Sequence, residues 1–276
     1  MPTNTPLVSV LTTSFNREAY IAETIESVLA QTFTDFEYII VDDCSKDRSF
    51  EIAQSYAAKD SRIRVSRNDK NLGDYPNRNK AAGYATGRYL KFIDSDDAMY
   101  PHCLDVMVRC LEICPIAGCG LSAAGLGTCR YPLVLDPIDA FKFHFTKRDL
   151  FGRSPGNAII RRSSFHEIGG FTGLRQVGDF QLWLKLAKSF PVVVMPRDLV
   201  WCRVHVGQVQ SEDSENDKRQ LRINVLQEEL LSPGGVLDLH EARQYIRSVK
   251  NHNLKDRLKS TASNLTRLIR WSCSSS

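Results

Sequence analysis

Residues 87–97 read Gly-Arg-Tyr-Leu-Lys-Phe-Ile-Asp-Ser-Asp-Asp, and the rest of the chain is interpreted outward from this stretch. The apolar run from Tyr89 to Ile93 predicts a buried β-strand that ends in Asp94, Asp96 and Asp97. If the extended geometry continues, Asp94 and Asp96 project to the same face. Two carboxylates about 5 Å apart repel by roughly 3 kcal/mol at an effective dielectric constant of ~20. A divalent cation such as Mg²⁺, Mn²⁺ or Ca²⁺ removes that cost, and a solvated acidic turn is the structural alternative.

Three more apolar strands are predicted before this one, at residues 7–13, 36–41 and 62–66. Helical patterns separate them. Asn16 is the expected N-cap of the first helix, Asp47 can cap the second, and Pro76 stands where the third begins. Alternating strands and helices predict an α/β fold with a mostly parallel sheet and right-handed crossovers.

Polar residues follow three of the predicted strands, in the runs Thr12-Thr13, Asp42-Asp43 and Asp94 to Asp97. Parallel α/β sheets bind their ligands beyond the carboxyl ends of the strands, so we expect these residues to meet at one edge. The chain has no Gly-x-Gly-x-x-Gly after the first strand, no P-loop and no Gly-x-Ser-x-Gly motif. An acidic edge that can hold a cation still suits a phosphate-bearing ligand.

The composition is that of an ordinary globular protein, with 276 residues, 42% hydrophobic and 25% charged. A net charge of +4 is too small to indicate a nucleic-acid partner. The N-terminus lacks the apolar core of a signal peptide, and no run reaches the roughly 18 apolar residues of a membrane span. We therefore expect a cytoplasmic protein, whose eight cysteines are reduced.

The second half of the chain is less regular. A clear helix opens at Gly178-Asp179, and a later strand runs into His205, whereas residues 136–156 give no assignment. Asp179 lies at the N-terminal end of its helix, where an ionised carboxylate is favourable, so a simple N-cap is as good an interpretation as a functional acid. A lone His at a strand end is by itself more often structural.

The composition changes after Gln210, which predicts a first domain over residues 1–211 and a helical C-terminal extension over residues 212–276. Residues 250–271 form a basic amphipathic pattern. Such a helix can lie on an anionic membrane surface, which would make the protein peripheral on the inner face of the membrane. The alternatives are packing on its own domain or on the partner of a homodimer.

Several motifs in this order resemble those of the family 2 inverting glycosyltransferases with the GT-A fold. The resemblance runs from Val8 to about Ser211. Its segments are Val8 to Arg17, Glu26 to Thr32, Ile40 to Asp47, Asn71-Leu-Gly, Arg78-Asn, Ala85 to Tyr89, Asp94-Ser-Asp-Asp, Gly169-Gly-Phe, Gly178-Asp179 and Arg203-x-His205. The family implies a Rossmann-like, mostly parallel sheet flanked by helices.

The resemblance also implies a nucleotide-diphosphate-sugar donor, with a UDP-sugar favoured, and a glycan or lipid-linked acceptor. Four residues, Thr13, Phe15, Asn16 and Arg17, match the family's first nucleotide-contacting loop. Asp43, with Asp42 beside it, matches the acid that contacts the base or ribose, and Arg78 matches a position near the donor phosphates.

For the chemistry, the resemblance assigns Asp94-Ser95-Asp96 to the Asp-x-Asp motif, in which the first acid faces the donor and the second ligates Mn²⁺ or Mg²⁺. Together with His205, which matches a position near the metal or diphosphate, Asp94 and Asp96 form the expected metal-binding set. Asp179 matches the general base, although the Glu that usually precedes it is Gly178 here. One base and one direct displacement invert the anomeric carbon.

The expected function is metal-dependent, inverting transfer of a single sugar in the synthesis of a cell-surface polysaccharide, glycolipid or glycoprotein glycan. A single transfer is favoured because the Gln-x-x-Arg-Trp motif of processive members is absent. One alternative is a sugar-nucleotide nucleotidyltransferase, which would need a glycine-rich basic loop after the first strand. Another is a catalytically silent nucleotide-sugar-binding protein, which the intact acids argue against.

Overall fold

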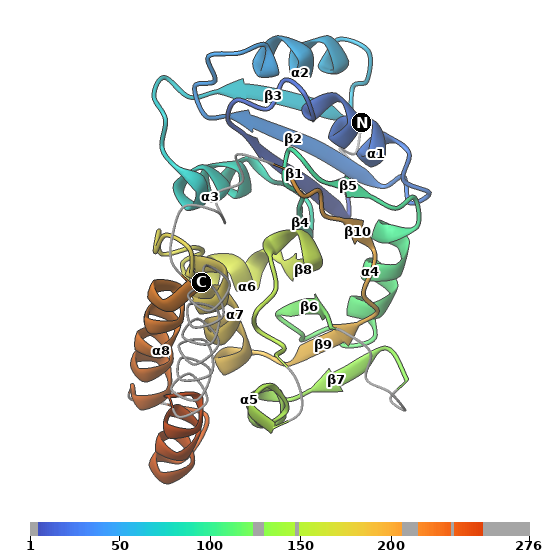
Figure 1. Cartoon of the computed structure of the whole chain (residues 1–276). Coiled ribbons are helices and arrows are strands. Elements are labelled where there is room, and N and C mark those ends of the chain that lie inside the picture. Colours follow the sequence, from blue (N-terminus) through green and yellow to red (C-terminus); the bar gives the residue numbers. More distant parts are fainter. Residues whose placement is uncertain (1–4, 124–129, 147–148, 206–214, 233–234, 251–276) are drawn as a thin grey trace, which may run out of the picture. The chain divides into compact units, whose positions relative to one another are not determined.

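The computed structural model describes residues 5–123, 130–146, 149–205, 215–232 and 235–250 (Figure 1). By the clustering of its contacts the chain divides into two compact units, residues 1–211 and residues 212–276. Each unit is described by itself below.

The first unit is built on an eight-stranded mixed sheet in the order β3-β2-β1-β4-β8-β6-β9-β7. Its parallel half contains β1 (Val8–Ser14), β2 (Phe36–Asp42), β3 (Ile63–Arg67) and β4 (Tyr89–Phe92). The other half contains β6 (Cys119–Ser122), β7 (Leu133–Leu135), β8 (Ala158–Arg161) and β9 (Val192–Met195). In this half β8 runs antiparallel to β4 and β6, whereas β6 and β9 are parallel. A separate antiparallel pair joins β5 (Ala98–Met99) to β10 (Val200–Trp201). The predicted α/β fold is confirmed.

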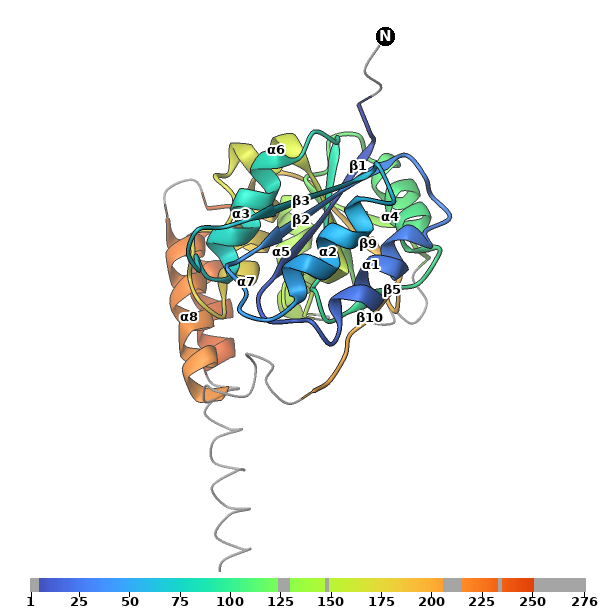
Figure 2. The same cartoon turned by 90° about the horizontal axis from the view of Figure 1, so that it is seen from above.

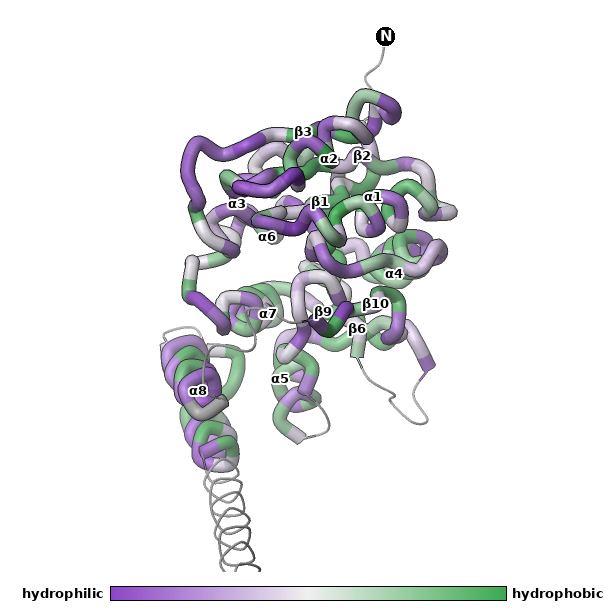
Figure 3. Tube along the Cα trace, turned by 45° about the horizontal axis from the view of Figure 1, so that its top comes forward, coloured by the Kyte–Doolittle hydropathy of each residue, from purple (hydrophilic) through white to green (hydrophobic). Residues whose placement is uncertain are grey.

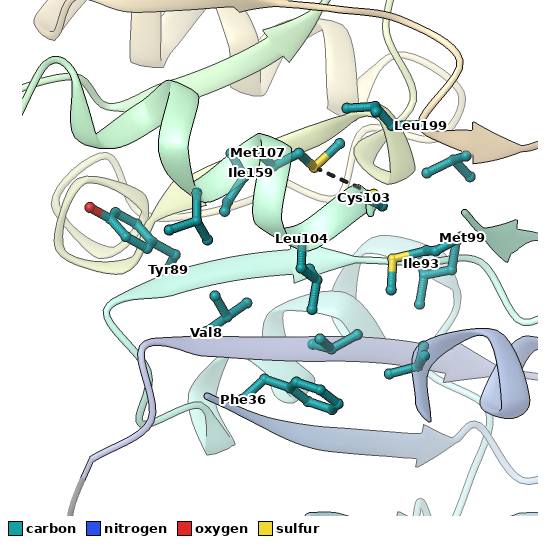
Figure 4. Packing of buried hydrophobic residues seen from close by; sticks show 14 of the residues in the cluster. Val8, Phe36, Tyr89, Ile93, Met99, Cys103, Leu104, Met107, Ile159 and Leu199 are labelled. Atoms are coloured by element: carbon teal, nitrogen blue, oxygen red, sulfur yellow. Dashed lines mark hydrogen bonds between the residues drawn. The ribbon is translucent and has the colours of Figure 1, made fainter. Parts of the chain in front are cut away.

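Helices cover both faces of the parallel half (Figure 2). One face carries α1 (Ile21–Leu29) and α2 (Ser49–Ala57), and the other carries α3 (Asp74–Tyr84). The helix α4 (Cys103–Glu112) packs on β6, β8 and β9 and joins the same buried cluster as α1. Apolar residues of α1 and α4 and alternate residues of the strands form one buried cluster, part of which is shown in Figure 4. The remaining helices of the unit are α5 (Pro137–Thr146), the 3-10 turn η1 (Pro155–Asn157), α6 (Arg162–Glu167) and α7 (Gly178–Ser189).

The parallel register brings the carboxyl ends of the strands to one edge, as predicted. Ser14 at the end of β1 is paired with Asp42 at the end of β2, and Leu11 of β1 is paired with Phe92 at the end of β4. Because the strands are parallel, the residues that follow Ser14, Asp42 and Phe92 all leave the sheet on the same side.

Two local predictions need correction. The extended geometry does not continue past β4: residues 94–97 form a turn, closed by the N–H of Asp97 donating to the carbonyl of Asp94 at 3.0 Å. Asn16 does not cap α1, which begins at Ile21, because a turn from Arg17 to Tyr20 comes first. Asn16 has a φ of 52° and lies in the preceding loop. The N-cap residue of α2 is Arg48. The carboxylate of Asp47, one residue earlier, accepts the N–H of Ser49, the first residue of α2, at 3.0 Å.

The second unit contains α8 (Glu215–Leu231) and a helical segment at residues 239–250. Residues 251–276, which hold most of the basic amphipathic pattern, lie outside the described residues. Within the part of the chain that the structure describes, none of the helices has the length and apolar character needed to cross a bilayer.

Glu37 of β2 ties the amino ends of the strands to the turn before β4. Its carboxylate accepts hydrogen bonds from the hydroxyl of Ser9 at 2.6 Å and from the N–H of Thr86 at 2.7 Å. Burial alone would raise the pKa of Glu37, but these hydrogen bonds, another from the hydroxyl of Thr86, and the charge of Arg64 together lower that pKa below its usual value of 4.5.

We predict that Glu37→Gln flattens the dependence of thermal stability on pH in acid. A pKa that is lower in the folded than in the unfolded state stabilises the fold above pH 4.5, and this contribution is lost as the pH falls through the folded-state pKa. Melting temperatures of both proteins between neutral pH and acid measure the effect. Ser9→Ala should give a smaller change in the same direction, and parallel curves for wild type and Glu37→Gln would contradict the assignment.

Candidate active site

The acids that follow β4 are each held by a different partner. Asp94 accepts a hydrogen bond from Nη2 of Arg78 at 2.6 Å. One oxygen of Asp96, Oδ2, lies 3.1 Å from Nε of Arg17 and 3.0 Å from Nε2 of His205. The turn thus places the two carboxylates of the Asp-x-Asp motif beside different arginines, Arg78 and Arg17, instead of on one face.

The environment shifts the pKa values of Asp94 and Asp97, the first and last acids of this turn, in opposite directions. Burial would raise the pKa of Asp94, but the guanidinium of Arg78 holds it below its usual value, so Asp94 is ionised. Burial and the neighbouring charge of Asp94 raise the pKa of Asp97 to about 6. Asp97 is 6% exposed, and its carboxylate accepts the backbone N–H of Arg203 at 2.9 Å. Asp97 therefore attaches residues 201–205 to the acid turn.

Arg203 and Tyr20 place His205 against Asp96. Nε of Arg203 donates to the carbonyl of Asp96 at 3.0 Å, and its guanidinium pairs with Glu23. The same guanidinium lies 5.0 Å from the ring centre of Tyr20, which in turn lies 4.5 Å from the ring of His205. The imidazole is thus packed against an aromatic side chain while its Nε2 meets the carboxylate.

The hydrophilic segment between β3 and α3, seen in purple in Figure 3, is organised by Asp43. Asp43 is 3% exposed, and its two oxygens accept hydrogen bonds from the side chain of Asn68 at 2.7 Å and from the N–H groups of Leu72 at 2.8 Å and Gly73 at 2.9 Å. Gly73 has a φ of 85°, a backbone conformation that glycine adopts without strain. Asp43 therefore fixes the path of the chain into α3.

The first turns of α3 connect the acid turn to Asp179. Arg78, which is 7% exposed, reaches Asp94 with one nitrogen and Asp74 with another at 2.7 Å. Tyr75, three residues earlier on the same side of the helix, accepts the N–H of Asp179 at 3.2 Å. Burial and the charge of Asp179 raise the pKa of Tyr75, so the phenol stays protonated beside the carboxylate. Asp94 and Asp179 thus border the same helix.

Gly178 is required by this contact with Tyr75. A Cβ at residue 178 would lie 2.7 Å from Cε2 of the Tyr75 ring, which also stacks on Phe171 with ring centres 5.0 Å apart. The family's usual Glu therefore cannot be accommodated before Asp179 in this chain without moving the ring. Asp179 follows as the second residue of α7, and its Oδ1 accepts the N–H of Phe180 at 2.7 Å.

We predict that Gly178→Ala lowers both stability and activity. The added methyl group overpacks the site, at a typical cost of about 1–3 kcal/mol, and displaces Tyr75 from the N–H of Asp179. Thermal melting and initial rates measure the two effects. Gly83→Ala in α3 is the matched control, because a Cβ there meets nothing within 4 Å. Equal melting temperatures for the two variants would contradict the prediction.

The loop after β1 is fastened to the loop after β2. The N–H of Asn16 donates to the hydroxyl of Ser45 at 3.0 Å, and its Oδ1 accepts the N–H of Lys46 at 2.8 Å. Asp42 accepts the N–H of Ser45 at 2.9 Å. Thr13, at the end of β1, and Phe15, which is 42% exposed, belong to the same edge. Ser95 is buried within the acid turn.

Most of the predicted site residues are linked by the contacts above. The exception is the expected metal-binding set, because Asp94 does not join Asp96 and His205. The described residues contain no group of three His, Cys, Asp or Glu side chains arranged to hold a metal ion. Asp96 and His205 are close, whereas Asp94 is turned toward Arg78. The residues still fit a hard divalent cation, since Mg²⁺ and similar ions often take one or two protein ligands plus water and phosphate oxygens. Asp96, with Nε2 of His205 3.0 Å from its Oδ2, would hold such an ion.

Three residues of this site were not identified from the sequence: Tyr75, Tyr20 and Glu23. Tyr75 was missed because the third helix was predicted to begin at Pro76, whereas α3 begins at Asp74 and so places Tyr75 one turn before Arg78. The roles of Tyr20 and Glu23 depend on Arg203, which lies 180 residues beyond Glu23, and no local pattern reports such a contact.

Comparison with known proteins matches this architecture to sugar-transferring enzymes. Residues 9–169 match the family described as glycosyl transferase family 2. The putative teichuronic acid biosynthesis glycosyltransferase TuaG of Bacillus subtilis is 43% identical over 193 residues, which are 67% of this chain and 73% of that protein.

Two solved structures share the fold. The first is S. aureus TarS 1-349 in complex with UDP-GlcNAc, with a TM-score of 0.68 and 21% identity over 90% of this chain and 72% of that one. The second is the mannosyltransferase PcManGT from Pyrobaculum calidifontis in complex with GDP-Man and Mn²⁺, with a TM-score of 0.62 and 17% identity over 96% of this chain and 81% of that one.

Proposed function

Because the chain belongs to glycosyl transferase family 2, we propose that it transfers a single sugar from a nucleotide-diphosphate sugar to an acceptor hydroxyl, with inversion at the anomeric carbon. A UDP-sugar is the favoured donor, and a polysaccharide or glycolipid is the favoured product. The main support for this proposal is that one segment, residues 72–78, contacts three of the predicted site acids: Asp43, Asp94 and Asp179.

Three buried polar atoms at this edge support binding of a nucleotide diphosphate. Within the described residues, Oγ of Ser14, Oδ2 of Asp42 and Nη1 of Arg78 have no hydrogen-bond partner. Buried polar groups without partners are costly, and a ligand that supplies the missing donors and acceptors removes the cost. The orphaned N–H groups of a guanidinium suit phosphate oxygens, and an orphaned carboxylate oxygen suits an N–H or O–H of the base or ribose.

The residues divide the work as follows. Residues 13–17 and Asp42 hold the nucleotide, and Asp43 acts by fixing the 68–73 segment beside it. Arg78 and Asp94 position the donor near its diphosphate. Asp96 and His205 would hold Mn²⁺ or Mg²⁺, which offsets the negative charge that grows on the diphosphate as it leaves.

Asp179 accepts the proton of the acceptor hydroxyl. The acceptor oxygen forms a bond to C1 as the bond from C1 to the diphosphate oxygen breaks, and the electron pair leaves with the diphosphate. Because attack and departure occur on opposite sides of C1 in one displacement, the configuration inverts. Tyr75 orients the carboxylate by accepting the backbone N–H of Asp179.

A screen of nucleotide sugars by thermal shift, with and without Mn²⁺, tests this function. We expect one UDP-sugar to raise the melting temperature strongly and only with the cation, and UDP to be released when a glycan acceptor is added. No stabilisation by any nucleotide sugar, or synthesis of a nucleotide sugar from a nucleoside triphosphate and a sugar phosphate, would contradict the proposal.

We also predict that Arg17→Gln tightens Mn²⁺ binding in the absence of donor. Arg17 donates to Oδ2 of Asp96, the same oxygen that faces His205, so its charge competes with the cation. Removing a unit charge this near a divalent ion should lower the dissociation constant for Mn²⁺ roughly tenfold. Free Mn²⁺ measured by electron paramagnetic resonance gives the constant. Arg67→Gln, which removes an arginine 3.5 Å from Asp42, is the control and should leave it unchanged.

A further inference from the structure

A cavity of about 450 Å³ lies at the opposite edge of the first unit, beyond the amino ends of the parallel strands. Its wall includes Leu7 just before β1, Asp35 just before β2 and Arg88 just before β4, together with Arg161 and Arg162 at the junction of β8 and α6. The volume is within the usual range of small-ligand pockets. Arg88 precedes β4 and Asp94 follows it, six positions further along the chain. An extended chain covers roughly 20 Å over six positions, so the cavity is separate from the acid edge.

The backbone that frames this cavity is fixed by hydrogen bonds of the sheet edge. The N–H of Tyr89 donates to the carbonyl of Leu7 at 3.0 Å, the N–H of Val8 to that of Asp35 at 3.3 Å, and the N–H of Arg162 to that of Arg88 at 3.0 Å. Side chains that project from such a frame are held in place before any ligand arrives, which lowers the cost of binding.

Backbone carbonyl groups hold two of the cavity arginines, Arg161 and Arg162, without neutralising their charges. Nε of Arg161 donates to the carbonyl of Ala117 at 2.9 Å, and Nε of Arg162 donates to the carbonyl of Gly87 at 2.7 Å. A carbonyl orients a guanidinium but does not cancel its charge. Among the described residues the three arginines have one ion pair, between Arg88 and Glu112 at 3.9 Å, and both of its side chains are about half exposed, so it contributes little.

Two of these positive charges also share one aromatic ring. The guanidinium carbons of Arg88 and Arg161 lie 5.3 Å and 5.4 Å from the ring centre of Tyr89. Among the described residues, the wall of this cavity therefore contains three arginines and one acid, Asp35. Like charges gathered in this way repel one another, and a bound anion removes the repulsion.

We propose that this arginine cavity binds a phosphate group, carried either by a membrane lipid or by a soluble phosphate ester. Guanidinium groups offer paired N–H donors that match the oxygens of phosphate. The exposed hydroxyls of Thr5 and Ser163 on the cavity wall can donate further hydrogen bonds. The cavity also exceeds the size of a lone phosphate, which leaves room for an attached glycerol or sugar.

Calorimetry with inorganic phosphate on the full chain tests the site. The double variant Arg88→Gln/Arg162→Gln should raise the dissociation constant for phosphate at least tenfold, because hydrogen bonds to charged groups are lost from two sides. Arg197→Gln is the matched control: it removes one exposed arginine, paired with Asp198 in the loop after β9, and should leave binding unchanged.

A second variant keeps the test decisive if the double variant does not fold. Ser163→Glu places a carboxylate on the cavity wall without removing an arginine contact, and an acid in the first turn of α6 is favourable for the helix. It should also weaken phosphate binding at least tenfold while its circular dichroism spectrum matches that of wild type.

Flotation with vesicles separates the two sources of phosphate. If binding to phosphatidylglycerol vesicles, but not to phosphatidylcholine vesicles, is lost in the cavity variants, the ligand is a lipid headgroup. If flotation is unchanged and only phosphate binding is lost, the ligand is a soluble ester. Phosphate affinity and flotation equal to those of Arg197→Gln in both cavity variants, or a wild-type protein that binds neither phosphate nor vesicles, would overturn the proposal.

Discussion

Asp179→Asn is expected to abolish sugar transfer while leaving donor binding intact. The amide has nearly the same shape as the carboxylate and can still accept the N–H of Phe180, so α7 and the contact with Tyr75 should be preserved. What is lost is the group that accepts the proton of the acceptor. A positioned general base typically contributes 10²–10⁴-fold to the rate. We therefore expect the rate of transfer to fall by about that factor.

Two measurements separate this role from a structural one. Calorimetry with the donor and Mn²⁺ should give the same affinity in wild type and variant, since the proposed role of Asp179 is to accept the proton of the acceptor. The acidic limb of the rate–pH profile should disappear with the carboxylate. Asp105→Asn in α4, where the acid pairs with the exposed Arg109, is the matched control and should keep full activity. Normal turnover by Asp179→Asn would rule out this base.

The fold and the convergence of the acids could be predicted from the sequence because both follow from local patterns. Periodicity placed β1, β2, β3 and β4 to within about two residues, and the parallel arrangement then required their carboxyl ends to meet. The direction of each acid could not be obtained in this way. The carboxylates of Asp94 and Asp96 face Arg78 and Arg17, which lie 16 and 79 positions away.

The same limit applies to the segment between β3 and α3, whose path the sequence does not predict. Its path depends on Asp43, whose partners Leu72 and Gly73 are 29 and 30 residues distant. Gly178 shows the opposite case. It stood out as a departure from the family pattern, and the reason is a single contact with Tyr75, which the sequence does not reveal. Departures from a motif are thus best interpreted once the packing partner is known.

The divalent cation is expected to depend on Asp96, and Asp96→Asn should therefore remove Mn²⁺ binding, the Mn²⁺-dependent part of donor binding and sugar transfer. A neutral amide keeps an oxygen near Arg17 and His205 but loses the charge that binds a hard cation. Titration of free Mn²⁺ followed by electron paramagnetic resonance measures the loss without reference to turnover. Asp96→Asn should weaken Mn²⁺ binding, whereas Arg17→Gln should strengthen it. The two variants therefore test the role of Oδ2 of Asp96 by opposite effects.

Asp97→Asn is the matched control for Asp96→Asn, because the two acids are adjacent, both are buried and both substitutions remove one carboxylate. An oxygen of Asp97 already accepts the N–H of Arg203, and an amide oxygen can do the same, so residues 201–205 should stay attached to the acid turn. We expect Asp97→Asn to retain Mn²⁺ binding. If instead Asp96→Asn binds Mn²⁺ as wild type does while Asp97→Asn does not, the cation is held by the second acid of the pair, and the assignment to Asp96 and His205 is wrong.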